Sequence, residues 1–73
     1  MITGHVKWFN ESKGFGFIRR DDNNEDILVH VSSIKNAGRG GVTAGELVAF
    51  EVEDNERGPR AVNVVVRKEL SAP

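Results

Sequence analysis

Residues that favour turns gather at four places along this 73-residue chain, and their spacing limits the length of every regular element. The clusters are rich in Gly, Pro, Asn and Asp and cover residues 10–14, 21–26, 36–45 and 54–59. The runs outside them are rich in β-branched and aromatic residues and are too short for stable helices. We therefore predict five strands, over residues 5–10, 15–20, 27–31, 47–53 and 61–67.

Five short strands in one small domain can close into a barrel or remain an open sheet. Closure removes the exposed sheet edges along which chains aggregate, so we predict an all-β fold, a five-stranded antiparallel Greek-key β-barrel of the OB-fold type. The domain is expected to span residues 1–67, followed by a short flexible tail over 68–73. The run 61–67 does not alternate cleanly, which predicts a bulge there, and residues 32–34 are expected to form one helical turn.

Composition excludes several classes of protein. The chain has no Cys and two His, so it lacks the residues for disulfides or for a closed zinc site. No apolar run is long enough to span a membrane and the first residues do not resemble a signal peptide, so we expect a cytoplasmic protein with no membrane partner. No motif places a nucleophile beside a base, and we expect no enzymatic activity, no catalytic residue, no metal, no cofactor and no small-molecule substrate.

The formal net charge is −1, from ten Lys and Arg against eleven Asp and Glu. A molecule with this net charge does not attract polyanions over its whole surface, so any nucleic-acid binding must depend on a local surface.

Two-residue periodicity assigns the faces of the central strands. In the second run, Phe15 and Phe17 share a side with Arg19, whereas Gly16 and Ile18 occupy the other side. Ile18 is the better core residue, which leaves the two rings facing outward, where large apolar groups mark a binding surface. In the third run, Leu28 and His30 lie on one side, and Ile27, Val29 and Val31 lie on the other. In the fourth run, the inward residues are Val48, Phe50 and Val52.

The outward rings lie beside cations and a further ring in the sequence. Trp8 and Lys7 are in the first predicted strand, and Lys13 precedes Phe15 by two residues. Rings that stack on bases and cations that contact phosphates are what a single-stranded nucleic acid requires. Each of these features alone is weak evidence for nucleic-acid binding. A pair of Phe residues in a small β protein, for example, is more often part of the core.

The motifs VKWFN at 6–10 and KGFGFI at 13–18 together resemble the first ribonucleoprotein motif of the cold-shock domain family. DILVHVSSI at 26–34 resembles the second motif, and GPRAVNV at 58–64 is similar to the family's turn before the last strand. The resemblance covers roughly residues 2–66. It implies a non-enzymatic protein that binds single-stranded RNA or DNA, acts as a nucleic-acid chaperone that keeps RNA unpaired, and influences transcription or translation. A preference for pyrimidine-rich strands is carried over from the family only, and a monomer is the simplest expectation.

The resemblance also implies a set of contact residues. The base-stacking residues are Trp8, Phe15, Phe17 and His30, and the cationic contacts are Lys7 and Lys13. Phe9 matches the motif as well, but it alternates away from Trp8, so stacking and core packing both remain open for it. His30 could equally be an ordinary surface histidine if its place in the motif were ignored.

This chain departs from the family pattern at three positions that the resemblance assigns to binding. Leu28 and Val31 stand where the family usually has Phe, and the loop at 36–45 has Arg39 but no aromatic residue. Leu28 and Val31 keep apolar contact with a base, and a guanidinium can stack on a base or hold a phosphate. Two lost stacking rings would cost roughly 2–6 kcal/mol, so we predict weaker binding than in a relative with all its aromatic residues.

The predicted nucleic-acid contacts are therefore Lys7, Trp8, Lys13, Phe15, Phe17, Leu28, His30, Val31 and Arg39. The missing aromatic residues and the slightly acidic charge leave one alternative, a module on the same fold that binds a protein or a second copy of itself.

Overall fold

The five predicted strands are all present in the computed structural model, which describes residues 1–35 and 42–67. They are β1 (Ile2–Asn10), β2 (Phe15–Arg20), β3 (Asp26–His30), β4 (Leu47–Asn55) and β5 (Gly58–Val66), with one 3₁₀ turn, η1 (Val31–Ser33), after β3. Sequence pattern predicted both ends of β2, the last residue of β1 and the first residue of β4, and the remaining strand boundaries differ by one to three residues.

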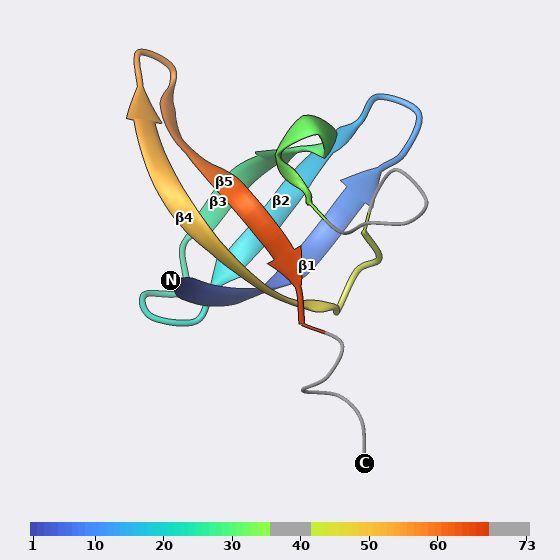
Figure 1. The fold of residues 1–73 in the computed structure, drawn as a ribbon, viewed down its shortest axis with the longest axis horizontal. Coiled ribbons are helices and arrows are strands. Elements are labelled where there is room, and N and C mark those ends of the chain that lie inside the picture. The colour runs from blue at the N-terminus through green and yellow to red at the C-terminus, as the bar shows by residue number, and fades with distance from the viewer. Residues whose placement is uncertain (36–41, 68–73) are drawn as a thin grey trace.

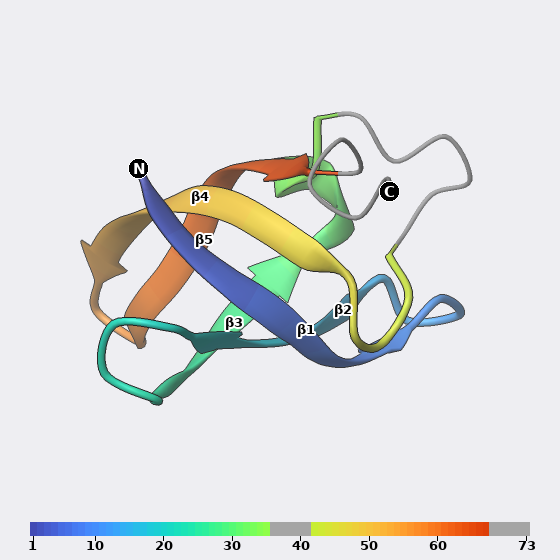
Figure 2. The same ribbon diagram turned by 90° about the horizontal axis from the view of Figure 1, so that it is seen from below.

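The strands form a closed barrel in the order β1-β2-β3-β5-β4, which confirms the predicted architecture. Antiparallel hairpins join β1 to β2, β2 to β3 and β4 to β5, and β4 returns to pair with β1. Parallel pairing of β3 with β5, through Leu28 with Arg60 and Val29 with Ala61, closes the other side. Figures 1 and 2 show β1, β2 and β3 side by side, with the β4–β5 hairpin crossing over them.

The core is aliphatic and contains a single fully buried aromatic ring, Phe50. Inward residues of all five strands contribute to it, as predicted for Ile18 and Val48: the buried cluster is Val6, Ile18, Ile27, Val29, Val42, Val48, Phe50, Ala61, Val64 and Val66. Ala49 was expected on the outer side of β4, yet only 2% of it is exposed. It lies between Thr3 of β1 and Val65 of β5, and a methyl group is too short to emerge between those neighbours.

The bulge predicted in the last strand is confirmed. Ala49 of β4 pairs with Val65 of β5, and Glu51 pairs with Val62. One residue of β4 lies between these two pairs, whereas two residues of β5 do, so β5 contains one extra residue. The extra residue is accommodated by Asn63, whose φ of 52° lies in the left-handed region that Asn tolerates better than most residues. Its side-chain amide donates a hydrogen bond to Glu51 Oε1 at 2.6 Å.

The third strand ends one residue earlier than predicted, at His30 instead of Val31. The His30 ring accepts a hydrogen bond from the backbone N–H of Ser32, and this cap turns the chain into η1. Val31 is therefore the first residue of the helical turn that was expected over residues 32–34. In the described part of the chain, no helix is long and apolar enough to cross a membrane. The predicted tail over 68–73 lies outside the described residues.

Gly16 of β2 lies directly against the backbone of β1. A Cβ atom built on Gly16 would overlap the carbonyl oxygen of Trp8 and lie 2.8 Å from the Cα atom of Phe9. Both obstacles are backbone atoms, which cannot move without shifting β1. Glycine is therefore required here for the space it leaves, and the packing of β1 on β2 depends on it.

We expect Gly16→Ala to destabilise the fold by about 1–3 kcal/mol or more, the usual cost of forcing a methyl group into filled space. Chemical denaturation would measure the free energy of unfolding. Gly45→Ala is the control, because that position has open space around its missing Cβ and a φ of 94°, so it reports the cost of backbone strain alone. A loss for Gly16→Ala well below about 1 kcal/mol would contradict the steric argument.

Candidate nucleic-acid interface

A bulge in β1 decides where Trp8 points. Val6 pairs with Ile18 and Trp8 pairs with Phe17, so β1 carries one extra residue, Lys7, that has no partner of its own in the β1–β2 register. Without it, Val6 and Trp8 would share a face; with it, Val6 is buried at 3% exposure and Trp8 is 41% exposed. The bulge brings both Lys7 and Trp8 to the outer surface of the barrel.

Trp8 packs against both outward rings of β2. Its ring centroid lies 5.7 Å from that of Phe15 in an edge-to-face arrangement and 5.4 Å from that of Phe17 in a tilted one. These distances are within the range favourable for aromatic pairs. The three predicted stacking rings therefore form one contiguous group.

Strand register extends this group onto β3. Phe15 is directly opposite His30, and Phe17 is directly opposite Leu28. We call the resulting surface the stacking face, defined by Trp8, Phe15, Phe17, Leu28 and His30. Leu28 is 39% exposed, so a large apolar side chain occupies the place where the resemblance leads one to expect a ring.

Most aromatic side chains of this chain lie outside the core. Of the four Phe residues and one Trp, only Phe50 is fully buried, while Trp8, Phe15 and Phe17 lie on the stacking face. Leaving a large apolar group in water forfeits roughly 1.5–3 kcal/mol of burial, so the arrangement is costly for a domain this small. Exposed apolar side chains that gather in one place are typical of binding surfaces.

Hydrogen bonds to Ser32 hold the His30 ring in one orientation. Its Nδ1 atom accepts the hydrogen bond from the Ser32 backbone N–H at 3.1 Å and lies 2.8 Å from Ser32 Oγ. Because a backbone N–H can only donate, the neutral ring must carry its proton on Nε2. The ring is thereby held in one orientation and presents a donor to a ligand.

Val31 and Lys13 lie at the end of the stacking face where the β1–β2 turn meets η1. Gly14, with a φ of 77°, closes that turn, and its carbonyl accepts a hydrogen bond from the Val31 backbone N–H at 2.8 Å. Val31 is half-buried against Gly14, so it offers less surface than Leu28. Lys13 is exposed and forms no ion pair with any described residue. Arg39 lies outside the described residues.

The cation predicted beside Trp8 is already paired. Lys7 Nζ lies 2.7 Å from Asp26 Oδ2, and Arg19 Nε lies 3.6 Å from Asp26 Oδ1. The hydrogen bond from Lys7 lowers the pKa of the Asp26 carboxyl, and the positive charges of Lys7 and Arg19 act in the same direction. Sequence reasoning did not single out Asp26; its period of two with Leu28 and His30 is the signal that places it on the same face.

A hollow of about 360 Å³ continues the stacking face towards the β4–β5 hairpin. Phe17 and Leu28 form one side of it, and residues of the hairpin form the other: Asn55, Arg57, Gly58, Pro59 and Arg60. Arg60 is paired with Glu53 at 2.9 Å, whereas Arg57 has no ion pair among the described residues. Neither arginine is among the contacts predicted from the sequence, since only the pairing of β3 with β5 brings them beside Phe17.

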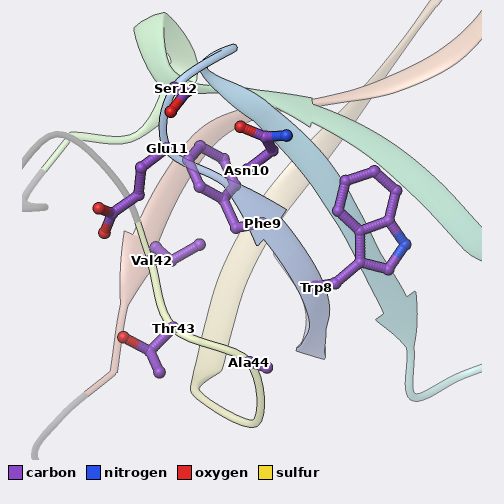
Figure 3. A pocket seen from close by; sticks show the side chains of 8 residues that line it. All are labelled: Trp8, Phe9, Asn10, Glu11, Ser12, Val42, Thr43 and Ala44. Carbon is purple, nitrogen blue, oxygen red and sulfur yellow. The ribbon is translucent and has the colours of Figure 1, made fainter.

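A second hollow, of about 630 Å³, lies at the opposite end, next to Trp8. Figure 3 shows its lining from β1, the β1–β2 turn and the segment before β4: Trp8, Phe9, Asn10, Glu11, Ser12, Val42, Thr43 and Ala44. Phe9 is directed towards Val42 and Trp8 stands on its other side. Phe9 packs against the core, so the structure favours core packing over stacking for this residue, although one edge borders the hollow.

The chain matches the family model of the "'Cold-shock' DNA-binding domain" over residues 2–67. Cold shock-like protein CspC of Buchnera aphidicola is 56% identical over 63 residues, which is 86% of this chain and 91% of that protein. CspC of Escherichia coli K12 is 52% identical over the same length, with the same coverage. Cold shock-like protein CspE of Buchnera aphidicola is 48% identical over 64 residues, 88% of this chain and 93% of that protein.

Among solved structures, the chain is similar to Drosophila Unr CSD456, with a TM-score of 0.77 at 21% identity. The match covers 99% of this chain and 29% of the longer one, and it supports the fold alone. The family's description supports nucleic-acid binding in general, and no catalytic family is indicated. On the family model and on these relatives, the chain belongs to the cold-shock domain family.

Proposed function

We propose that this protein binds single-stranded RNA or DNA by stacking bases on the stacking face, without enzymatic activity, and so keeps RNA unpaired. The observation that carries the proposal is the contact of Trp8 with both Phe15 and Phe17 on the outer surface of the barrel. An aromatic base has a π-face that fits such a group whatever its identity, so the binding is expected to tolerate many sequences.

The cations suit this function by their position at the two ends of the stacking face. Lys13 lies in the turn beside Phe15, and Arg57 lies across the hollow from Phe17 and Leu28. A strand that runs from the hollow beside Trp8, over the rings, to the hollow beside Arg57 keeps its bases on apolar surface and its phosphates near these charges. Its affinity should therefore fall as salt rises.

Keeping RNA unpaired requires only mass action. A protein that binds the open strand and not the duplex shifts the melting of a hairpin by its differential affinity, with no nucleotide hydrolysis. Such binding supports effects on transcription or translation, because both processes are sensitive to RNA hairpins. A pyrimidine-rich ligand and a monomeric state belong to the same proposal.

Titration with oligothymidine or oligouridine at low salt is expected to quench the fluorescence of Trp8, which is the single Trp of a chain without Tyr. Phe17→Ala should weaken binding by about 1–3 kcal/mol, or roughly five- to 150-fold, because one stacking ring is removed. Val65→Ala is the control, since Val65 is half-buried on β5 and pairs with Ala49 of β4, away from β2. Absence of quenching in the unmodified protein would favour a protein-interaction module, which sedimentation would test as self-association.

Leu28→Phe is expected to tighten binding by about tenfold, towards the low end of the 1–3 kcal/mol that a stacking ring contributes. The position has room for a ring because Leu28 is 39% exposed and borders a hollow. Leu28→Ile serves as the matched variant, since it keeps an apolar side chain of equal size but has no π-face. Equal affinities for the two variants would show that apolar contact alone matters at this position.

A further inference from the structure

His30 is the titratable member of the stacking face, and its ring has two different partners on Ser32. The backbone N–H of Ser32 donates to His30 Nδ1 at 3.1 Å, and Ser32 Oγ lies 2.8 Å from the same nitrogen. A backbone N–H can only donate, whereas a hydroxyl can donate or accept. Ser32 therefore has a partner for Nδ1 both when this nitrogen has a lone pair and when it carries a proton.

The two protonation states of the His30 ring use these partners differently. In the neutral ring, Nδ1 accepts from the Ser32 N–H, so a second proton must bind at Nδ1. Once it has bound, the Ser32 N–H loses its acceptor and turns to water, which reaches it because Ser32 is exposed. Ser32 Oγ then accepts a charge-assisted hydrogen bond from the Nδ1–H group. The ring keeps its orientation although its charge changes.

The other edge of the ring faces the turn that carries Lys13. His30 Nε2 lies 4.0 Å from the position that a Cβ atom would take on Gly14, the residue after Lys13. The charged residues on the elements around His30 are, in this turn, Glu11 and Lys13; on β2, Arg19 and Arg20; at the start of β3, Asp26; and on β5, Arg60. Glu11 lines the hollow beside Val42. Within the described residues no carboxylate pairs with His30, so protonation leaves a positive charge available to a phosphate.

We propose that Ser32 is a positioning residue that holds the His30 ring in one orientation in both protonation states, and that protonation of His30 strengthens single-strand binding. The inference rests on the proposed function. A phosphate near Lys13 lies at the end of the stacking face towards which Nε2 is directed, so it attracts an imidazolium more than a neutral ring. Because the strand favours the protonated form, affinity rises as the pH falls through the range, from about 8 to 5, in which histidine side chains ordinarily change charge.

The measurement is the ratio of the affinities for oligothymidine at about pH 5.5 and about pH 8, at constant low ionic strength, followed by Trp8 fluorescence. The unmodified protein should bind about two- to fivefold more tightly at the lower pH, the effect of one exposed ion pair. His30→Gln should lose most of this gain, because its side chain does not titrate. His5→Gln should keep it, because His5 Nδ1 pairs with Asp21 of the protein itself at 3.1 Å.

Ser32→Ala separates the positioning of the ring from its charge. The variant keeps the backbone N–H that caps the neutral ring, so its affinity at about pH 8 should change by less than about twofold. At about pH 5.5 the protonated Nδ1 faces an N–H group and has no acceptor, so most of the gain in affinity should be lost. Ser33→Ala is the matched control, because Ser33 lies in the same 3₁₀ turn and its hydroxyl has no hydrogen bond to a described residue.

Nitrogen-15 NMR of the imidazole rings reads the same states without nucleic acid. At about pH 8 the proton of His30 should be on Nε2, since Nδ1 accepts from Ser32. The proton of His5 should be on Nδ1, which faces the Asp21 carboxylate, a group that can only accept. The two histidines should therefore show opposite tautomers, and His5 serves as the internal reference. Thermal unfolding of each variant would show whether the barrel is intact.

A neutral His30 ring with its proton on Nδ1 would overturn the inference. Equal affinities of the unmodified protein at the two pH values, or a gain that His30→Gln or Ser32→Ala leaves intact, would also overturn it. If the unmodified protein failed to show quenching of Trp8 at either pH, the single-strand function itself would fall and the pH effect with it, whereas the NMR pattern would still decide whether Ser32 positions the ring.

Discussion

The close approach of β1 to β2 is the contact on which the rest of this structure depends. Gly16 has no Cβ, so the backbone of β1 at Trp8 and Phe9 can lie directly against it. Immediately before Trp8, the bulge at Lys7 changes the alternation of β1, so Val6 enters the core while Trp8 reaches the surface. Without the bulge, β1 would have to bury Trp8 or expose Val6, and burying Trp8 would remove its contact with the rings of β2.

The barrel uses different types of side chain in its core and on the stacking face. Aliphatic residues with Phe50 fill the interior, and three of the five aromatic side chains are left on the surface. Small domains have little apolar surface in reserve, so this distribution reduces the stability that the same composition could provide. In the proposed function, a base that stacks on the rings removes them from water and compensates for this loss.

Charge is organised locally in this chain of net charge −1. Near the stacking face, Lys7 and Arg19 share Asp26, and Arg60 is paired with Glu53. These exposed pairs keep the local surface close to neutral. In the proposed function, stacking contributes more than charge, which is the reverse of the balance in a strongly basic nucleic-acid-binding domain.

Sequence by itself determined the number of strands, the complete extent of β2, the outward direction of Phe15 and Phe17, and the aliphatic core residues of β2 and β3, because these follow from turn signals and from alternation within one strand. Tertiary structure decided what depends on pairing between distant segments. The bulge at Lys7 is defined only by counting against β2, and Asp26 becomes the partner of Arg19 only through the register of β2 with β3. Arg57 comes beside Phe17 because β5 closes the barrel against β3. Alternation is a property of one strand, whereas register and closure arise from packing between strands, and the residues of a single segment do not encode them.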